Sequence, residues 1–267
     1  MASRALALLA GAWVAAVCGC RSIGGVRVGS DQAQRVPVAE AQQMRHEAEL
    51  LYNQQPRSLA SVTRAAGLFE QAAHTLQNDY LAQWEAAEAE EFLAANETQA
   101  DLRRQSAQRG IAFGRRAREL KPDGVEACYW YALNVGWLAD VDRAYGLDAV
   151  TEMQSALKRA IELDERYDYA GPLRLLGVLH LRTPQPPASI GSPRKGLRLL
   201  ERAVSLFPDY PENQLYLAEA LRDNNRVDEA KEALGKVLEA KPWPDQQFES
   251  QQWKADALKL RAQLDKL

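Results

Sequence analysis

Apolar residues recur at steps of three and four along most of the chain from about residue 37. One such stripe is Leu197, Leu200, Val204 and Phe207, which lies on one face of a helix with 3.6 residues per turn. No run of alternating β-branched residues bounded by hairpin turns interrupts this pattern. The spacing predicts first helices over 37–53, 80–95, 125–139, 169–181 and 211–222, second helices over 58–76, 99–119, 147–163, 193–206 and 227–240, and a last helix over 247–265.

The second helices end in related phrases, which indicates an internal repeat. Ala203-Val-Ser-Leu-Phe-Pro208 and Val237-Leu-Glu-Ala-Lys-Pro242 place their prolines 34 residues apart, the length of a tetratricopeptide repeat. The steps from Pro122 to Glu165 and from Glu165 to Pro208 are 43, and the extra residues fall between the helices of those units. In the unit that opens at Asp168, the repeat alignment must be shifted by about two residues. Only then does Leu176-Gly177, a large residue beside a small one, match the equivalent pair of the other first helices.

Residues 36–267 are therefore expected to form an all-α, tetratricopeptide-like helical-repeat solenoid of about five helix pairs with a C-terminal capping helix. A solenoid needs a polar-faced cap at its open end. The last helix fits that role, because Trp253, Ala257, Leu260 and Leu264 form a single apolar face.

The chain begins with a short apolar leader. A 13-residue apolar stretch, Ala5 to Val17, follows Arg4 and leads into Val17-Cys18-Gly19-Cys20. That stretch is too short to span a hydrocarbon core of about 30 Å, but it suits a secretory signal. An aliphatic residue three before a Cys and a small residue directly before it form the bacterial lipoprotein pattern, so residues 1–19 are predicted to be a signal peptide and Cys20 the lipidated residue. The alternative is an ordinary secretory signal with Cys20 free.

The predicted anchor sets the expected location. Residues 20–35 hold several glycines and no helical period, as in a flexible tether. A lipid anchor would hold the protein on the membrane at the periplasmic face of a bacterial envelope. Arg21, in place of the Asp that retains lipoproteins in the inner membrane, favours the outer membrane. Loss of the leader takes the formal charge from −3 to −4, since Arg4 is its only charged residue. Lys and Arg are interspersed with Asp and Glu along the chain, which gives no sign of nucleic-acid binding.

Catalytic and metal-binding patterns are missing from the sequence. The histidines, His46, His74 and His180, fall on different predicted helices with no carboxylate or Cys at metal-ligand spacing. Cys128 is the only cysteine besides the leader pair, so it has no disulfide partner within the mature chain, and an apolar setting favours a buried role for it. We expect no enzyme, no metal and no cofactor.

The Pro-rich loop from Thr183 to Ser192 suggests a first candidate site, to which Ser189 belongs. Ser192 is a good N-cap and is followed by Pro193 at the first helical position. Arg194 and Lys195 then occupy the first turn, where the helix dipole disfavours cations. Together with free backbone N–H groups they could hold a carboxylate at the mouth of a groove formed by Tyr129 and its neighbours. The alternative is that both cations pair with a nearby Glu or point into water.

Aromatic residues suggest a second candidate site. Tyr129, Trp130 and Tyr131 are consecutive and spread over about 200° of helix, so they cannot all face one neighbour. Residues four apart on the first helices are expected to line the inner groove, beginning with Tyr129 and Leu133 and continuing with Arg174. The alternative is core packing for most of them. The candidate partner- or ligand-binding residues are Tyr129, Trp130, Leu133, Arg174, Ser189, Arg194 and Lys195.

Four phrases together resemble a known family over about residues 110–240: Tyr129-Trp-Tyr-Ala-Leu-Asn134, Asp168-Tyr-Ala-Gly-Pro172, Ser189-Ile-Gly-Ser-Pro-Arg-Lys195 and Pro208-Asp-Tyr-Pro-Glu-Asn213. They look like the TatT lipoprotein family, the T component associated with TRAP transporters. The resemblance implies a periplasmic helical-repeat lipoprotein that engages the transporter's solute receptor and helps pass a hydrophobic or organic-acid ligand.

The sequence thus predicts a non-enzymatic, lipid-anchored scaffold whose groove binds a partner, either a periplasmic solute-binding protein or another envelope protein. Two alternatives stay open. One is a carrier that encloses a small hydrophobic or organic-acid ligand in an aromatic groove, and the other is an envelope-assembly scaffold unrelated to transport. Homo-oligomerisation is also left open. Neighbouring genes would discriminate best, because TRAP permease genes favour transport and envelope-biogenesis genes favour assembly.

Overall fold

The computed structural model describes residues 36–266. Within that range the chain forms helices and no strand, as the periodicity predicts. Each predicted helix is found with its ends within about two residues of the expected bounds, and the loop between α6 and α7 contains one extra 3₁₀ turn. The helices are α2 (Val38–Tyr52), α3 (Leu59–Thr75), α4 (Tyr80–Asn96), α5 (Ala100–Leu120), α6 (Val125–Val141), η1 (Arg143–Tyr145), α7 (Gly146–Asp164), α8 (Tyr167–Arg182), α9 (Pro193–Leu206), α10 (Pro211–Asp223), α11 (Val227–Glu239) and α12 (Gln247–Leu264).

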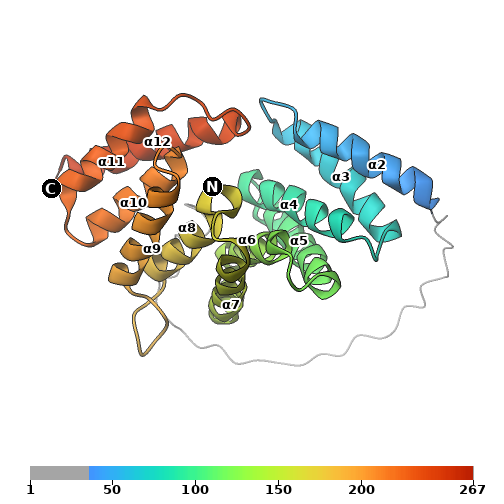
Figure 1. The fold of residues 1–267 in the computed structure, drawn as a ribbon, viewed down its shortest axis with the longest axis horizontal. Helices are drawn as coiled ribbons and strands as arrows, with labels where there is room; N and C mark the ends of the chain where they lie inside the picture. The colour runs from blue at the N-terminus through green and yellow to red at the C-terminus, as the bar shows by residue number, and fades with distance from the viewer. Residues whose placement is uncertain (1–35, 267) are drawn as a thin grey trace.

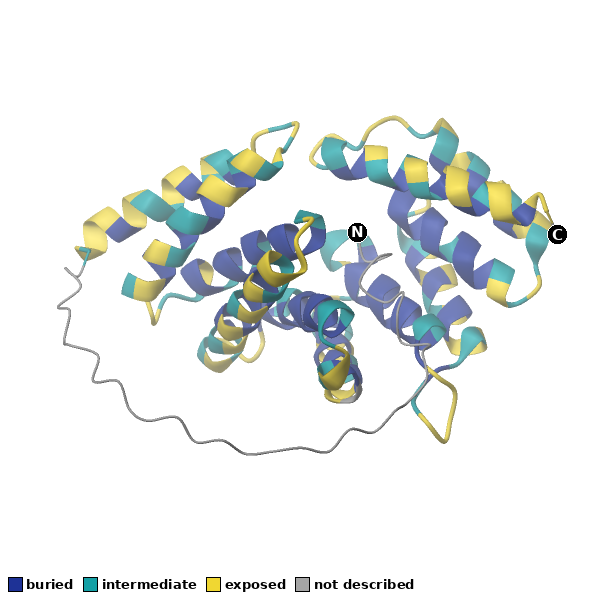
Figure 2. Ribbon diagram, turned by 180° about the vertical axis from the view of Figure 1, so that it is seen from behind, coloured by how far each residue is buried: buried dark blue, intermediate teal, exposed yellow. Residues whose placement is uncertain are grey.

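The helices pack as consecutive pairs that stack into a strongly curved solenoid (Figure 1). First helices such as α6 and α10 are buried on nearly every side, because they pack against their own partner and against both neighbouring units. Second helices such as α9 bury one stripe and expose the opposite face (Figure 2). For α6 and α9 this division matches the rule that an apolar helix is internal and an amphipathic one covers the surface, whereas α10 is internal although it also buries polar residues. The tetratricopeptide-like architecture is therefore confirmed.

The predicted capping helix lies at the end of the stack. In α12, Trp253, Ala257, Leu260 and Leu264 are all at least 95 % buried and belong to the core that continues through α10 and α11. The opposite side of the helix is exposed, with Leu258 58 % accessible. No described helix is both long enough and apolar enough to cross a membrane. The predicted signal peptide (1–19), Cys20 and the tether (20–35) lie outside the described residues.

An irregular turn opens α8 and explains the two-residue slip in the repeat register. Asp168, Tyr169 and Ala170 have φ angles of 46°, 54° and 66°, in the left-handed region that non-glycine residues rarely adopt. The regular right-handed helix follows Ala170. The expected helix start at residue 169 is therefore wrong by about two residues, because three residues are used in the left-handed turn.

Two glycines allow α8 and α9 to approach closely. A Cβ atom on Gly177 would lie 2.8 Å from Cγ of Leu200, and one on Gly196 would lie 2.9 Å from the carbonyl oxygen of Gly177. Leu200 is fully buried at this crossing. The small residue of the Leu176-Gly177 pair therefore lies at the contact between the two helices.

Leu200→Ala should destabilise the solenoid, because truncating a fully buried Leu leaves a cavity and costs about 2–5 kcal/mol of unfolding free energy. The loss should be largest in the units that contain α8 to α11, since repeats contact mainly their neighbours. Chemical denaturation of wild type and variant, with hydrogen exchange to locate the change, measures both effects. An unchanged denaturation midpoint would contradict the packing described here.

Candidate binding site in the groove

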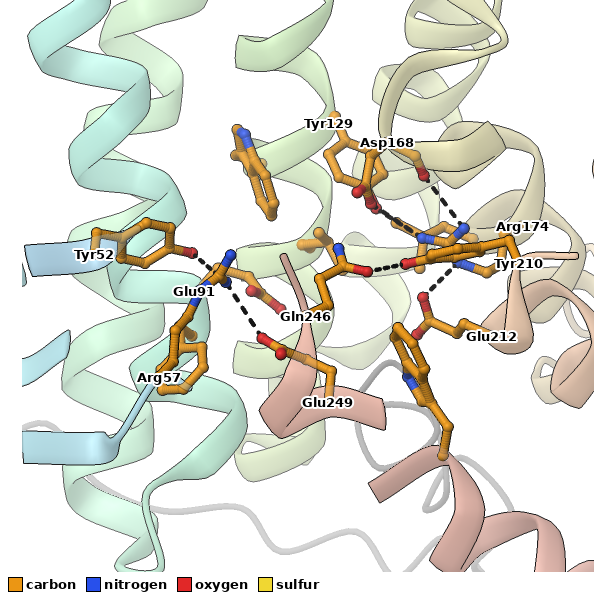
Figure 3. Close-up of a pocket in the computed structure, with 15 residues that line it drawn as sticks. Tyr52, Arg57, Glu91, Tyr129, Asp168, Arg174, Tyr210, Glu212, Gln246 and Glu249 are labelled. Carbon is orange, nitrogen blue, oxygen red and sulfur yellow. Dashed lines mark hydrogen bonds and ion pairs between the residues drawn. The ribbon is translucent and has the colours of Figure 1, made fainter. Parts of the chain in front are cut away.

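A pocket lies at the centre of the curved stack, lined by side chains from the first helices and from α12. The space open to water inside it is about 70 Å³. Figure 3 shows Tyr52 and Arg57 approaching from one side, the Arg174 cluster on the other, and Gln246 and Glu249 between them. The lining residues are Tyr52, Arg57, Glu91, Phe92, Tyr129, Trp130, Leu133, Asp168, Arg174, Leu175, Tyr210, Glu212, Gln246, Glu249 and Trp253.

The two ends of the solenoid meet beside this pocket. Gln55 Nε2 donates to the carbonyl oxygen of Asp245 at 2.7 Å, and Arg57 Nη2 donates to the same oxygen at 3.1 Å. Arg57 Nη1 also lies 3.3 Å from Glu249 Oε1. We call Gln55, Arg57, Asp245 and Glu249 the clasp. It joins the loop between α2 and α3 to the segment that begins α12, so the groove is closed on this side.

A buried guanidinium forms one wall of the pocket. Arg174 is only 2 % exposed, and its Nη2 donates to Asp168 Oδ2 at 3.0 Å. Its Nη1 donates to Asn213 Oδ1 at 3.0 Å, and its Nε lies 3.0 Å from Glu212 Oε2. The Tyr129 hydroxyl donates to Asp168. Burial opposes a charge on Arg174, but these carboxylates and polar groups outweigh it and hold its pKa above the ordinary value.

The left-handed turn supplies part of this arrangement. Arg174 Nη1 also lies 3.3 Å from the carbonyl oxygens of Asp168 and Tyr169, both within the turn. Gly171 follows the turn, and a Cβ there would come within 2.5 Å of the Tyr129 hydroxyl oxygen. The strained backbone therefore directs both a carboxylate and two carbonyl groups at one guanidinium, and Gly171 provides the room for the tyrosine.

The opposite wall carries carboxylates that lack a matching cation. Glu91 accepts a hydrogen bond from Trp137 Nε1 at 2.8 Å and is 7 % exposed. Burial raises the pKa of Glu91 to about 7. Glu88, one turn earlier on α4, lies outside the pocket lining, is half-buried and forms no ion pair within the described range, and burial raises its pKa to about 8. The pocket lining holds four carboxylates, Glu91, Asp168, Glu212 and Glu249, against two arginines, a formal charge of −2.

Aromatic rings form the remaining surface. Tyr129 and Trp130 meet edge to face with 4.9 Å between ring centroids, and Trp130 Nε1 donates to the Tyr167 hydroxyl at 3.0 Å. Trp130 stays half-buried, whereas Tyr129 is 2 % exposed. On the clasp side the Arg57 guanidinium lies 4.6 Å from the centroid of the Tyr52 ring. The groove thus combines aromatic faces with excess negative charge, which suits cations better than anions.

The structure brings together four of the seven candidate groove and loop residues. Tyr129, Trp130, Leu133 and Arg174 all line the pocket. Ser189, Arg194 and Lys195 do not line it; they lie in the loop between α8 and α9 and in the first turn of α9, which project from the lower edge of the molecule in Figure 1.

The predicted cap at the start of α9 is confirmed, since the Ser192 hydroxyl accepts from the Lys195 amide at 3.4 Å. Arg194 and Lys195 are exposed, and neither forms an ion pair with another described residue. The structure does not place them beside Tyr129. Their proposed role in holding a carboxylate therefore stays a prediction for the loop alone, separate from the pocket.

Sequence reasoning did not find Arg57, Glu88, Glu91, Glu212 or Glu249. One signal was available for two of them: Glu85, Glu88 and Glu91 recur every three residues on α4, a helix whose other faces are rich in alanine and buried. A carboxylate stripe on an otherwise internal helix indicates a groove surface. No local signal marks the clasp, because Arg57 and Glu249 are brought together only by the curvature of the whole stack.

Comparisons with known proteins agree with this architecture. Residues 191–247 match the tetratricopeptide repeat family. Among curated proteins, none matches this sequence. The solved structure of TTC0263, a thermophilic tetratricopeptide-repeat protein of Thermus thermophilus, is 22 % identical with a TM-score of 0.60, over 82 % of this chain and 98 % of that one.

The described chain is a tetratricopeptide-type solenoid. PilW, described as a widely conserved type IV pilus biogenesis factor, has a TM-score of 0.53 at 17 % identity, over 84 % of this chain and 91 % of its own. MamA from residue 41 onwards, of Desulfovibrio magneticus RS-1, has a TM-score of 0.51 at 16 % identity, over 74 % and 93 %. At these identities the likenesses establish the solenoid fold. Tetratricopeptide-repeat proteins commonly bind partner proteins. Within the described residues no cluster of metal ligands is found.

The raised pKa of Glu88 makes the stability of this solenoid pH-dependent. A carboxyl group with a pKa of about 8 when folded and an ordinary value when unfolded binds protons more tightly in the folded state. Its contribution to stability is then fully present below the unfolded pKa and is lost as the pH rises from there towards 8. Glu88→Gln should remove this loss. At pH 8.5 its free energy of unfolding should therefore exceed that of wild type by an amount on the order of 2 kcal/mol.

The measurement is chemical denaturation at pH 5.0 and pH 8.5. Glu162→Gln, which neutralises an exposed carboxylate on α7, is the matched control and should leave the pH dependence as in wild type. Equal pH dependence for wild type and Glu88→Gln would show that Glu88 is ionised and solvated in the folded protein.

Proposed function

We propose that this protein is a lipid-anchored scaffold of the bacterial envelope whose groove binds a partner protein. The observation that carries the proposal is the chemistry of the groove. Trp130 lines the pocket, and Glu88 lies one turn of α4 from the lining residue Glu91. Both remain half-buried, in contrast to the closely packed first-helix residues around them, and Glu88 forms no ion pair with a described residue. Surfaces of this kind, an aromatic ring beside unpaired polar groups, are typical of protein recognition sites.

The pocket favours a protein partner over a small-molecule cargo. Drug-sized ligands occupy sites of about 300–1,000 Å³ with mostly apolar walls. The pocket offers about 70 Å³ and a lining with an excess of two carboxylates. A hydrophobic cargo would bury charged groups, and an organic acid would meet repulsion. A side chain from a bound protein fits this space better than either cargo.

The anchor, the location and the partner's identity rest on the sequence. The apolar leader with Val17-Cys18-Gly19-Cys20 supports a lipidated Cys20, and Arg21 supports the outer membrane. The resemblance of four phrases to TatT lipoproteins supports the solute receptor of a TRAP-type transporter as the partner. Three of those phrases, around Tyr129, Asp168 and Tyr210, supply residues that line the pocket. The protein would then hold the receptor close to the membrane.

Cys20→Ala should release the protein from membranes while leaving a folded domain, since the anchor precedes the solenoid by a glycine-containing segment. Cells that express wild type and variant are fractionated, and circular dichroism of the released variant checks that it is folded. A variant that still sediments with membranes as fully as wild type contradicts the lipid anchor.

A photo-crosslinking amino acid in place of Trp130 should capture the partner in living cells, because Trp130 lies in the groove and is partly accessible. The control carries the same amino acid at Leu258, which is 58 % exposed and absent from the pocket lining. Mass spectrometry that identifies a TRAP-type solute receptor at position 130 and not at position 258 supports the proposal. An envelope-assembly protein at position 130 supports the alternative scaffold, and equal products at both positions contradict a role for the groove.

A further inference from the structure

The pocket contains polar atoms that the protein itself does not satisfy. Glu249 is 6 % exposed, and its Oε2 atom has no hydrogen-bond partner. Trp253 is 2 % exposed, and its Nε1 donor is likewise unpartnered. The two residues are four apart on α12, and both line the pocket. A buried polar group without a partner carries a substantial desolvation cost, so such atoms at a cavity wall indicate a bound group that completes them.

The charges around the cavity specify the sign of that group. Arg174 is matched by Asp168 and Glu212 on its own wall. Arg57 is matched by the Oε1 atom of Glu249. Among the described residues, Glu91 is hydrogen-bonded to the neutral indole of Trp137 and forms no ion pair, and Glu88 forms no ion pair although Arg57 acts on it at longer range. Two carboxylates on α4 and one carboxylate oxygen on α12 are therefore left without a matching cation.

Arg57 is an example of a cation held at the edge of this pocket. The Arg57 guanidinium lies over the Tyr52 ring and against Glu249, with an aromatic face below and a carboxylate at its edge. The pocket lining holds the same two components a second time, in Trp130 and Glu91. An aromatic face beside a carboxylate in a partly desolvated site favours a positively charged group.

We propose that the pocket receives the ammonium or guanidinium end of a lysine or arginine side chain from an extended segment of the bound partner. This inference rests on the proposed function and adds the chemistry of the partner. The charged end approaches Glu91 and the free Oε2 of Glu249 in the pocket that Trp130 also lines, and Glu88, one turn of α4 from Glu91, adds its negative charge from outside the lining. A carbonyl group of the same segment accepts from the Trp253 N–H. An aspartate or glutamate side chain would meet like charges and is excluded from this position.

Occupation of the pocket by a cation releases protons. Near pH 7, burial keeps a fraction of Glu88 and Glu91 protonated in the free protein. The charged groups that act on them are Arg57 in the α2–α3 loop and Glu85 on α4, with Asp168 from the turn of α8 and Glu212 on α10. Glu249 and Arg174 also line the same pocket. A bound cation favours the ionised carboxylates, so binding should tighten as the pH rises from 6.0 to 8.5.

The test uses the full chain purified in detergent and a fluorescein-labelled peptide, Gly-Ser-Lys-Ser-Lys-Ser-Gly, followed by fluorescence anisotropy at low salt. The matched peptide carries norleucine at both lysine positions and so keeps the aliphatic length without the charge. The lysine peptide should bind at least tenfold more tightly than the norleucine peptide, and more tightly at pH 8.5 than at pH 6.0.

Two double variants with the same change in net charge separate the pocket from general electrostatic attraction. Glu88→Gln with Glu91→Gln should lose at least tenfold in affinity for the lysine peptide. Glu119→Gln with Glu162→Gln, which neutralises two exposed carboxylates outside the pocket, should retain it. Thermal melting confirms that both are folded. Equal affinity for the two peptides, as expected if water completes the unpartnered atoms, or equal losses in the two variants, would overturn the inference.

The same variants separate this inference from the proposed function. The Trp130 crosslinking experiment is repeated with Glu88→Gln and Glu91→Gln present. Loss of lysine selectivity in vitro with undiminished capture of the partner in cells would mean that the groove binds its partner without a cationic side chain. Absence of both peptide binding and partner capture in the wild type would refute the groove as a binding site altogether.

Discussion

The middle of the solenoid depends on the position of one buried cation. Arg174 contacts the turn that opens α8, Asn213 and Glu212 on α10, and through Asp168 the tyrosine hydroxyl of α6. A guanidinium removed from water is tolerable only when its partners are held in place. The first helices α6, α8 and α10 must therefore keep fixed positions relative to one another along their axes. The left-handed turn persists despite a cost of about 1–3 kcal/mol per strained residue, because it places two carbonyl groups and a carboxylate where Arg174 needs them.

The prediction from sequence succeeded where the determining interactions are local. Helix bounds follow from apolar spacing, from caps such as Ser192 and from the prolines that begin or follow helices, all of which are written in short stretches of chain. Arg174 could be named as a groove residue for the same reason, because the helical spacing along a first helix decides which residues face the groove. Its ion pairs with Asp168 and Glu212 could not be predicted, since they depend on how the α8 unit packs against the α10 unit.

Other features could not be predicted, because they depend on the curvature of the whole molecule. The turn at Asp168 contradicts the local preference of three non-glycine residues, and it is held by contacts from other units, among them those of Arg174 and the hydrogen bond from Asn213 to the Tyr169 carbonyl oxygen. The clasp joins residues about 190 positions apart, and no short-range pattern encodes such a pairing. The broken dipole rule at Arg194 and Lys195 pointed to a loop whose side chains are exposed at a different edge from the pocket, so a local anomaly was not a guide to the groove.

The clasp also changes how the stack is expected to fold and unfold. In an open solenoid each unit touches only its neighbours, so the terminal helices fray first and folding spreads along the array. Here the first helix pair is tied to the segment that begins the last helix by contacts such as Gln55 with Asp245, and Phe92 on α4 packs against Phe248 of that same segment. These contacts join the first and last units of the described stack. Contacts of such long sequence separation raise the contact order, which slows folding, and they oppose fraying of the α2–α3 loop and of the segment that begins α12.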